Sequence, residues 1–325
     1  MILTANDYKR LIESGFDIID KRGQRLPFIL NDAQNEFLIY YLGEKYPQMQ
    51  GVRENIAKAR QEGFSALVDA VFAIDFLVQE NVGSQIISHK EKETQILLDR
   101  VNFYLDSFME KNNIPRTALL ATDRRDYLEN SQNGSYIFIG TAGAKTLGRG
   151  GTLQNIHWSE PAFYPNTEIL NAEKLVTAAE QQVLMGTGKI FRESTGNVVG
   201  DFFHNEVERS RLMDSSFGYY FCPWYKHSEY KTSERFELKE NEAALYEELS
   251  TIPQQLTDDQ IYWFILKMRE FKSLALGRRE YPTVVEDCFL AGGESIFDKD
   301  ILRAWYVKAI DPAKTGSLGM DGEWY

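Results

Sequence analysis

The chain has 325 residues, of which 43% are hydrophobic and 13% aromatic, so it can bury the core of one large or two modest domains. Its net charge of −12 argues against a surface that is basic throughout, although a local stripe of Lys and Arg can still bind nucleic acid. Two distant cysteines, four histidines without metal-ligand spacing and no signal-like or membrane-length apolar run predict a soluble protein of a reducing compartment, with neither a disulfide framework nor a structural zinc site.

The N-terminal half predicts helices around one short strand. Residues 7–41 have a helical pattern, with Asn31 as a plausible cap ahead of Gln34. A short strand is predicted at 53–57, and a long apolar helix follows at 66–78. The segment between them therefore has a strand before it and a helix after it.

The alternation continues to about residue 225. The predicted strands are 83–88, 117–121, 135–140, 153–158 and 188–193, and the predicted helices are 90–109, 171–184 and 199–211. This order favours a three-layer α/β domain with a mostly parallel sheet. Ligands of such sheets bind at the carboxyl ends of the strands, where the candidate residues below all lie.

The composition changes after residue 225. Residues 226–256 are highly charged and precede a helix at 258–274, which Thr257 caps. The chain finishes with a new strand at 304–310 and a glycine-rich tail. We predict three parts: an N-terminal helical segment with the α/β core (1–225), a small lid or linker subdomain (226–303) and the truncated first strand of a further domain (304–325).

The segment KARQEGFS, residues 58–65, resembles a phosphate-binding loop, G-x-x-x-x-G-K-[ST]. Gly63 and the hydroxyl of Ser65 are kept, but Phe64 stands where the lysine is usual and Lys58 replaces the first glycine. A lysine at the start of the loop can still fold back over the phosphates. Taken alone, the segment leaves open a helix start with a chance glycine.

Three further segments contain residues that could take part in nucleotide binding or hydrolysis. Glu160 ends the strand IHWSE, where nucleotide hydrolysis needs a carboxylate to orient water, but Ser159 takes the place of the usual metal-binding Asp. Ser194 and Thr195, in ESTGN, could contact the γ-phosphate or cap a helix. Arg149, in the glycine-rich segment 141–152, is a candidate arginine finger, or else a solvated loop residue or a DNA phosphate contact.

Taken in order, Gln34, KARQEGFS, IHWSEPAFY and EST-G-N resemble the ATPase half of a tailed-phage large terminase, the DNA-packaging motor subunit. Residues 280–289, with YPT and EDCF, resemble the segment that closes that region. The resemblance covers roughly residues 25–315. It implies a RecA/ASCE-like P-loop NTPase fold with a small lid, and ATP and Mg²⁺ as cofactors.

The resemblance also implies roles for individual residues. Glu160 becomes the catalytic carboxylate, Arg149 a finger acting on the next subunit, and Ser65 the Mg²⁺ ligand. Ser194 and Thr195 become the coupling segment. The expected nucleotide-binding residues are Gln34 at the adenine, Lys58 as the displaced phosphate-binding lysine, Arg60 as a loop cation, and the remaining loop positions Gln61, Gly63, Phe64 and Ser65.

The end of the sequence fits the same family. Large terminases continue into an RNase H-like nuclease whose first metal-binding Asp follows a first strand, and Asp311 in YVKAIDPAKTG matches that context. The other strands are missing here, so no nuclease activity is expected of this chain. An ordinary Asp-Pro turn is the alternative for Asp311.

The function implied is an ATPase motor that moves double-stranded DNA into a procapsid in the host cytoplasm. The expected partners are double-stranded DNA, the portal protein, the small terminase subunit and further copies of the chain in a ring. Two alternatives stay open: a helicase-like DNA-remodelling ATPase, and a degenerate module that binds DNA or portal without hydrolysis.

Overall fold

The computed structural model describes residues 2–142, 152–165 and 171–289. Arg149, Asp311 and the strand predicted at 304–310 lie outside these residues, so their roles stay predictions. Within the described ranges, none of the helices combines the length and apolar character needed to cross a membrane.

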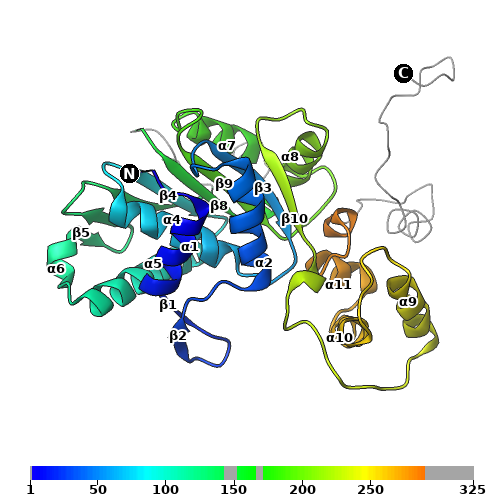
Figure 1. The fold of residues 1–325 in the computed structure, drawn as a ribbon. Coiled ribbons are helices and arrows are strands. Elements are labelled where there is room, and N and C mark those ends of the chain that lie inside the picture. The colour runs from blue at the N-terminus through cyan, green and yellow to red at the C-terminus, as the bar shows by residue number, and fades with distance from the viewer. Residues whose placement is uncertain (1, 143–151, 166–170, 290–325) are drawn as a thin grey trace, which may run out of the picture.

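An eight-stranded sheet forms the centre of the molecule, in the order β10-β3-β9-β8-β4-β7-β6-β5 (Figure 1). The six strands from β10 to β7 are parallel, and β6 and β5 continue the sheet antiparallel. The strands are β3 (Val52–Lys58), β4 (Gly83–Ser88), β5 (Leu120–Arg124), β6 (Tyr127–Asn130), β7 (Tyr136–Thr141), β8 (Asn155–Ser159), β9 (Lys189–Ser194) and β10 (Gly218–Cys222).

Helices cover both faces of the sheet. On one face α4 (Phe64–Val78) and α5 (Glu91–Asn112) pack against the strands, with α1 (Ala5–Gly15) outside them. The other face carries α7 (Ala172–Glu180) and α8 (Phe202–Arg211). Helix α4 is apolar almost all round because it lies between the sheet and α1, as expected for a helix buried between layers. The predicted three-layer α/β fold is confirmed.

The single helical segment predicted at 7–41 is wrong in its middle. A two-stranded hairpin, β1 (Asp17–Ile19) and β2 (Arg25–Pro27), separates α1 from the helical residues α2 (Asp32–Asn35), η1 (Glu36–Leu42) and α3 (Gly43–Lys45). The hairpin turn forms because the Asp20 carboxylate accepts two backbone N–H bonds and Gly23 has φ +77°. The predicted Asn31 cap is confirmed, in a reciprocal capping box with Gln34.

Two later predictions also need correction. The strand predicted at 117–121 begins as a helical turn, α6 (Arg116–Leu119), because Pro115 precedes it as the N-cap residue. The helix predicted at 258–274 divides into α10 (Asp258–Met268) and α11 (Leu274–Glu280), since Ser273 caps a new helix.

The described residues 223–289 form a small subdomain beyond the β10 edge of the sheet (Figure 1). It contains η3 (Trp224–Lys226), α9 (Glu240–Ser250), α10, α11 and η4 (Val285–Cys288). Its core is aromatic, with the rings of Trp224, Tyr230 and Trp263 stacked. Ala59, from the candidate phosphate loop, belongs to the same apolar cluster, so the subdomain packs directly on that loop. The three-part division of the chain itself stays a prediction.

Candidate active site

The candidate phosphate loop connects the last residue of β3, Lys58, to the first residue of α4, Phe64. Gly63 holds φ +80°, a left-handed conformation that suits glycine. No side chain caps the N-terminus of α4. A 15-residue helix therefore begins at the loop with first-turn N–H groups available to an anion.

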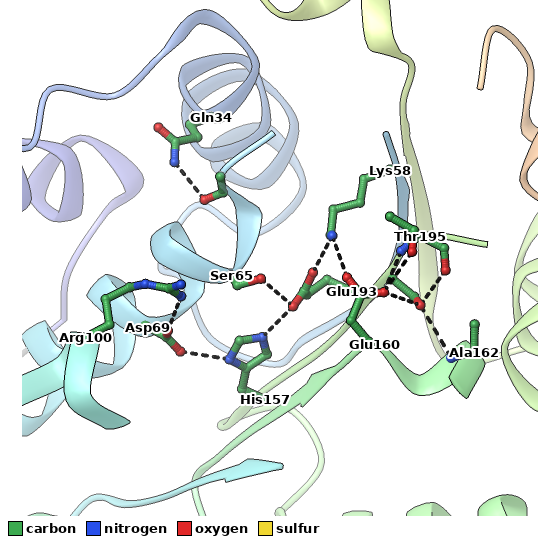
Figure 2. Close-up of polar contacts among 12 residues, drawn as sticks. Gln34, Lys58, Ser65, Asp69, Arg100, His157, Glu160, Ala162, Glu193 and Thr195 are labelled. Carbon is green, nitrogen blue, oxygen red and sulfur yellow. Dashed lines mark hydrogen bonds and ion pairs between the residues drawn. The ribbon is translucent and has the colours of Figure 1, made fainter. Parts of the chain in front are cut away.

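The structure explains why the lysine of this loop is displaced. Phe64 is buried against Phe37 with the ring centroids 5.2 Å apart, so the side chain at the usual lysine position belongs to the core. Lys58 instead reaches back from β3, and its Nζ lies 2.9 Å from Glu160 Oε1 and 3.1 Å from Glu193 Oε2 (Figure 2). Burial opposes its charge, yet the two carboxylates hold the pKa of Lys58 above its ordinary value. The charge that the loop needs is thus supplied from β3.

Glu160 follows β8 and has a left-handed backbone conformation, φ 55° and ψ 49°. One carboxylate oxygen pairs with Lys58, and the other accepts hydrogen bonds from Ser194 Oγ at 3.0 Å, Thr195 N at 2.9 Å and Thr195 Oγ1 at 3.0 Å. A non-glycine residue in this conformation costs free energy and persists where its surroundings fix it. The predicted catalytic carboxylate and the predicted coupling segment are therefore one hydrogen-bonded unit.

A buried network of side chains, which was not predicted from the sequence, lies behind Glu160 and its hydrogen-bond partners and supports them. Glu193 Oε1 accepts from Ser65 Oγ at 2.8 Å and lies 3.2 Å from His157 Nε2. His157 Nδ1 lies 2.9 Å from Asp69, which pairs with Arg100 at 2.8 Å. A sequence signal was present: His157 and Glu193 are titratable residues at the ends of predicted strands in an α/β domain, next to the positions proposed for the site.

Charges alternate along this network. Burial alone would lower the pKa of His157, but its hydrogen bonds to Asp69 and Glu193 raise that pKa to about 9, so the ring carries a proton on each nitrogen at neutral pH. Burial alone would raise the pKa of Glu193, but Lys58 and then His157 lower it. From α5 toward the cavity, positively and negatively charged side chains alternate in space, in the order Arg100 (+), Asp69 (−), His157 (+), Glu193 (−), Lys58 (+) and Glu160 (−).

Glu62 is the exception within the loop. It is fully buried, and neither carboxyl oxygen has an N–H or O–H hydrogen-bond partner among the described residues, the Cys222 thiol being the side-chain donor that acts on its pKa. Burial raises its pKa to about 9 against the opposing charge of Lys58. The carboxyl is therefore neutral at physiological pH, which leaves Lys58 to the other two carboxylates.

Gln34 and Arg60 hold the loop from two sides. Gln34 Nε2 donates to the carbonyl of Gly63 at 2.8 Å, and Gln34 also completes the capping box with Asn31 (Figure 2). The Arg60 guanidinium pairs with Glu280 of α11 at 3.0 Å. Their predicted contacts, with adenine and with phosphates, stay predictions.

The described site residues surround one large cavity of about 1630 Å³. Ser194 is brought to it only through Glu160, and Arg149 lies outside the described residues. The predicted residues that line the cavity are Gln34, Lys58, Arg60, Gln61, Gly63, Phe64, Ser65, Glu160 and Thr195. This volume exceeds the size of an ordinary small-molecule pocket, so a nucleotide can enter with space to spare.

The residues present fit a nucleotide with Mg²⁺. The uncapped α4 N-terminus suits phosphates, and the Ser65 proton points to Glu193, which leaves the oxygen lone pairs for a cation. Within the described ranges no group of three His, Cys, Asp or Glu residues could hold a metal alone. Mg²⁺ in nucleotide sites commonly takes one or two protein ligands together with phosphates and water, which is what this site offers.

The chain is similar in structure to two phage proteins. It matches the crystal structure of the HK97 bacteriophage large terminase with a TM-score of 0.56 and 12% sequence identity, over 86% of this chain and 55% of that one. It matches the large terminase from a thermophilic bacteriophage with a TM-score of 0.52 and 13% identity, over 83% of this chain and 57% of that one. No protein-family model and no curated protein matches the sequence.

At 12% and 13% identity, these likenesses show the fold alone. The expected resemblance to large terminases is confirmed at that level, as is the α/β P-loop NTPase fold. The chain spans little more than half the length of either terminase. These likenesses therefore assign neither an activity nor residue roles to this chain.

Proposed function

We propose that this chain is the ATPase part of a large terminase, which hydrolyses ATP to move double-stranded DNA into a procapsid. One observation carries the proposal: Lys58 and Ser65, predicted from one segment, and Glu160, predicted from another, converge on the cavity at the uncapped start of α4. The terminase fold adds the expectation of a packaging motor.

In the proposed reaction, Lys58 neutralises phosphate charge and Glu160 orients the attacking water. Phosphates that bind Lys58 compete with Glu160 for the same ammonium group, 2.9 Å away, and so release one carboxylate oxygen toward the reacting water. Bound Mg²⁺ supplies further neutralisation of the phosphate oxygens, with Ser65 as its ligand. Thr195 and Ser194 hold the other Glu160 oxygen throughout.

Contacts between the site and the small subdomain suggest how hydrolysis reaches the rest of the motor. Gly196 follows the coupling segment, and a Cβ there would lie 1.7 Å from the carbonyl oxygen of Cys288 in η4. Arg60 is joined to Glu280 by its backbone N–H as well as by its side chain. Movement of the loop or of Thr195 therefore presses directly on the subdomain.

The helicase-like alternative requires a second RecA-like domain. In the part of the chain that the structure describes, residues 223–289 contain helices and 3₁₀ turns but no strand. We therefore keep the motor as the proposed function. DNA, the portal protein, the small terminase subunit and a ring of subunits are its proposed partners.

Mg²⁺-dependent ATP hydrolysis, measured with and without linear duplex DNA, tests this function. We expect Glu160→Gln to lower turnover by about 10²- to 10⁴-fold because it removes the water-orienting carboxylate. Lys58→Ala should lower both nucleotide affinity and turnover. Glu208→Gln is the control, since Glu208 lies on α8 in an exposed pair with Arg211.

A parent chain that neither hydrolyses nor binds ATP would overturn the proposal and favour the degenerate module. Binding without turnover would point to a missing cation from a neighbouring subunit, for which Arg149 is the candidate. Stimulation by duplex DNA would favour the packaging motor over an ATPase unrelated to DNA.

A further inference from the structure

Position 159 lacks the acidic residue that a nucleotide site of this kind normally places beside its Mg²⁺-binding hydroxyl. Ser159 is the last residue of β8 and lies directly opposite Glu193 in the parallel β8–β9 ladder. Side chains alternate along a strand, so Ser159 faces the same side as His157, which contacts α4. Glu193, as the paired residue on the neighbouring strand, shares that side.

Glu193 makes the contacts that an acid at position 159 would be expected to make. Its Oε1 accepts from Ser65 Oγ at 2.8 Å, and its Oε2 lies 3.1 Å from Lys58 Nζ (Figure 2). It is fully buried and ionised, and Oε2 has no hydrogen-bond partner among the described residues beyond this ion pair. From this position behind the phosphate loop, its carboxylate can orient both the Ser65 hydroxyl and the Lys58 ammonium group.

We propose that Glu193 is the acidic positioning residue of the Mg²⁺–nucleotide site, supplied by β9 in place of the absent Asp at position 159. This inference rests on the proposed ATPase function. Glu193 fixes the Ser65 hydroxyl with its proton inward and its lone pairs toward the cavity, and it places Lys58 between the phosphates and Glu160.

The packing around Glu193 supports a fixed orientation. His157 donates to the same oxygen that Ser65 uses, and Asp69 holds the opposite nitrogen of the ring. Because His157 is locked from both sides, the Glu193 carboxylate has one favoured rotamer. Strand β9 pairs directly with β3, the strand that leads into the loop, so Glu193 starts next to the strand that carries Lys58.

The test measures the affinity of a fluorescent ADP derivative, N-methylanthraniloyl-ADP, with Mg²⁺ and with EDTA. The ratio of the two affinities isolates the contribution of the cation. We expect Glu193→Gln to reduce this ratio by about 10- to 100-fold while the affinity in EDTA changes little. Glu180→Gln is the matched control, because Glu180 is also a buried ion-paired carboxylate but lies on α7, where it binds Arg192.

A variant that moves the carboxylate from position 193 to position 159 distinguishes a specific role in Mg²⁺ binding from the general effect of removing a buried charge. Ser159→Asp in the Glu193→Gln background should restore much of the Mg²⁺ dependence, because it returns a carboxylate to the paired strand position. Glu193→Asp keeps the charge beside Lys58 and His157, so it should fold even if Glu193→Gln does not. Its shorter side chain withdraws from Ser65 and should lower the ratio by an intermediate amount.

The possible outcomes distinguish a failure of the proposed Glu193 role from a failure of the proposed ATPase function. A parent chain that fails to bind the ADP derivative with or without Mg²⁺ overturns both. A parent chain with Mg²⁺-dependent affinity that Glu193→Gln and Glu193→Asp leave unchanged overturns the inference and keeps the ATPase. Equal losses in Mg²⁺ and EDTA, with no rescue by Ser159→Asp, would show that Glu193 only holds the loop together.

Discussion

The two ends of the central sheet both contain buried charges, but they are built differently. At the amino end, Asp75 accepts from Tyr8 on one oxygen, and from Asn155 and Lys189 on the other, these last two at 2.8 Å. The cavity beside this cluster holds only about 110 Å³. The amino-end cluster is therefore matched and borders little open space, as expected for a group that holds layers together.

At the carboxyl end the charges are incompletely matched and border a cavity of about 1630 Å³. Neither Glu62 oxygen has an N–H or O–H partner within the described residues, Glu193 Oε2 has only its ion pair with Lys58, and α4 begins without a side-chain cap. Glu160 holds a left-handed backbone conformation there. Buried charge is common to both ends, so the functional end is marked instead by a large cavity, an uncapped helix N-terminus and a strained residue that occur together.

The largest expected effect separates two buried lysines. Lys189→Met should lower the free energy of unfolding by about 3–5 kcal/mol, because it leaves Asp75 buried without its cation. Nucleotide affinity at a temperature where the variant is folded should not change. Chemical denaturation and titration with N-methylanthraniloyl-ADP measure the two quantities.

Lys58→Met is the matched variant at the other end. It should lower nucleotide affinity about tenfold or more through the lost charge-assisted contact. If Lys189→Met weakened nucleotide binding as much as Lys58→Met, the division between a structural and a functional end would be wrong.

The second prediction concerns Glu62, whose carboxyl has an ordinary pKa of 4.5 and about 9 when buried. The folded state binds more protons than the unfolded state between these values, so stability falls as pH rises through that window. Glu62→Gln removes this loss. It should raise the free energy of unfolding by roughly 3 kcal/mol at pH 7 but by less than about 1 kcal/mol at pH 5.

Urea unfolding of both proteins at the two pH values checks this result. The comparison at pH 5 is its own control, since the folded side chain is neutral at both pH values and pH 5 lies close to the pKa of 4.5 at which the unfolded Glu62 begins to ionise. A stability difference that stays constant with pH would show that Glu62 is not held neutral by burial.

Much of this fold was predictable from the sequence because strands such as β4 and β7 are short runs rich in β-branched residues, although β6 and β10 have no counterpart among the predicted strands. The strand at 83–88 matches β4 at both ends, and the order of strands and helices places Lys58 and Glu160 at the carboxyl edge. Local pattern failed where charged residues form structure. The hairpin β1–β2 is held by Asp20 and Gly23 in a segment that reads as one continuous helix.

The site was predictable only in part, for a physical reason. Ser65 and Glu160 could be predicted because Ser65 ends a recognisable loop motif and Glu160 follows a predicted strand. The link between Ser65 and Glu193 depends on β9 lying beside β3, the strand that leads into the loop, and on the register that sets Glu193 opposite Ile56. No local pattern encodes strand order, so the acid on the neighbouring strand emerges only from the fold.

The third prediction compares two glycines with nearly the same conformation. Gly63 has φ +80° and a Cβ there would lie 2.7 Å from Gln34 Nε2, whereas Gly186, at the amino end, has φ +85° and open space. Gly63→Ala should cost about 1–2 kcal/mol of stability and also weaken nucleotide binding, because it displaces Gln34 from the loop.

Gly186→Ala is the control, with an expected cost of about 1 kcal/mol from the backbone alone and no effect on nucleotide affinity. Thermal unfolding and the ADP titration measure both variants. Equal behaviour of the two would show that Gly63 supplies backbone freedom only and that its contact with Gln34 does not shape the loop.

The smallest expected effect concerns Thr195, which gives Glu160 one of its hydrogen bonds through a side chain. Thr195→Val keeps the shape and the backbone N–H bond but removes the hydroxyl, so stability should fall by only about 1 kcal/mol. ATP turnover should fall more than this small cost suggests, by about tenfold, because a less restrained Glu160 orients water poorly. Steady-state kinetics should show the loss in kcat with little change in KM.

Thr187→Val, which removes an exposed hydroxyl near the amino end, is the control and should leave both constants unchanged. A Thr195→Val enzyme with parental kcat would mean that the backbone N–H and Ser194 alone position Glu160. The Thr195 hydroxyl would then contribute only to stability, as the contacts of Asp75 do at the amino end.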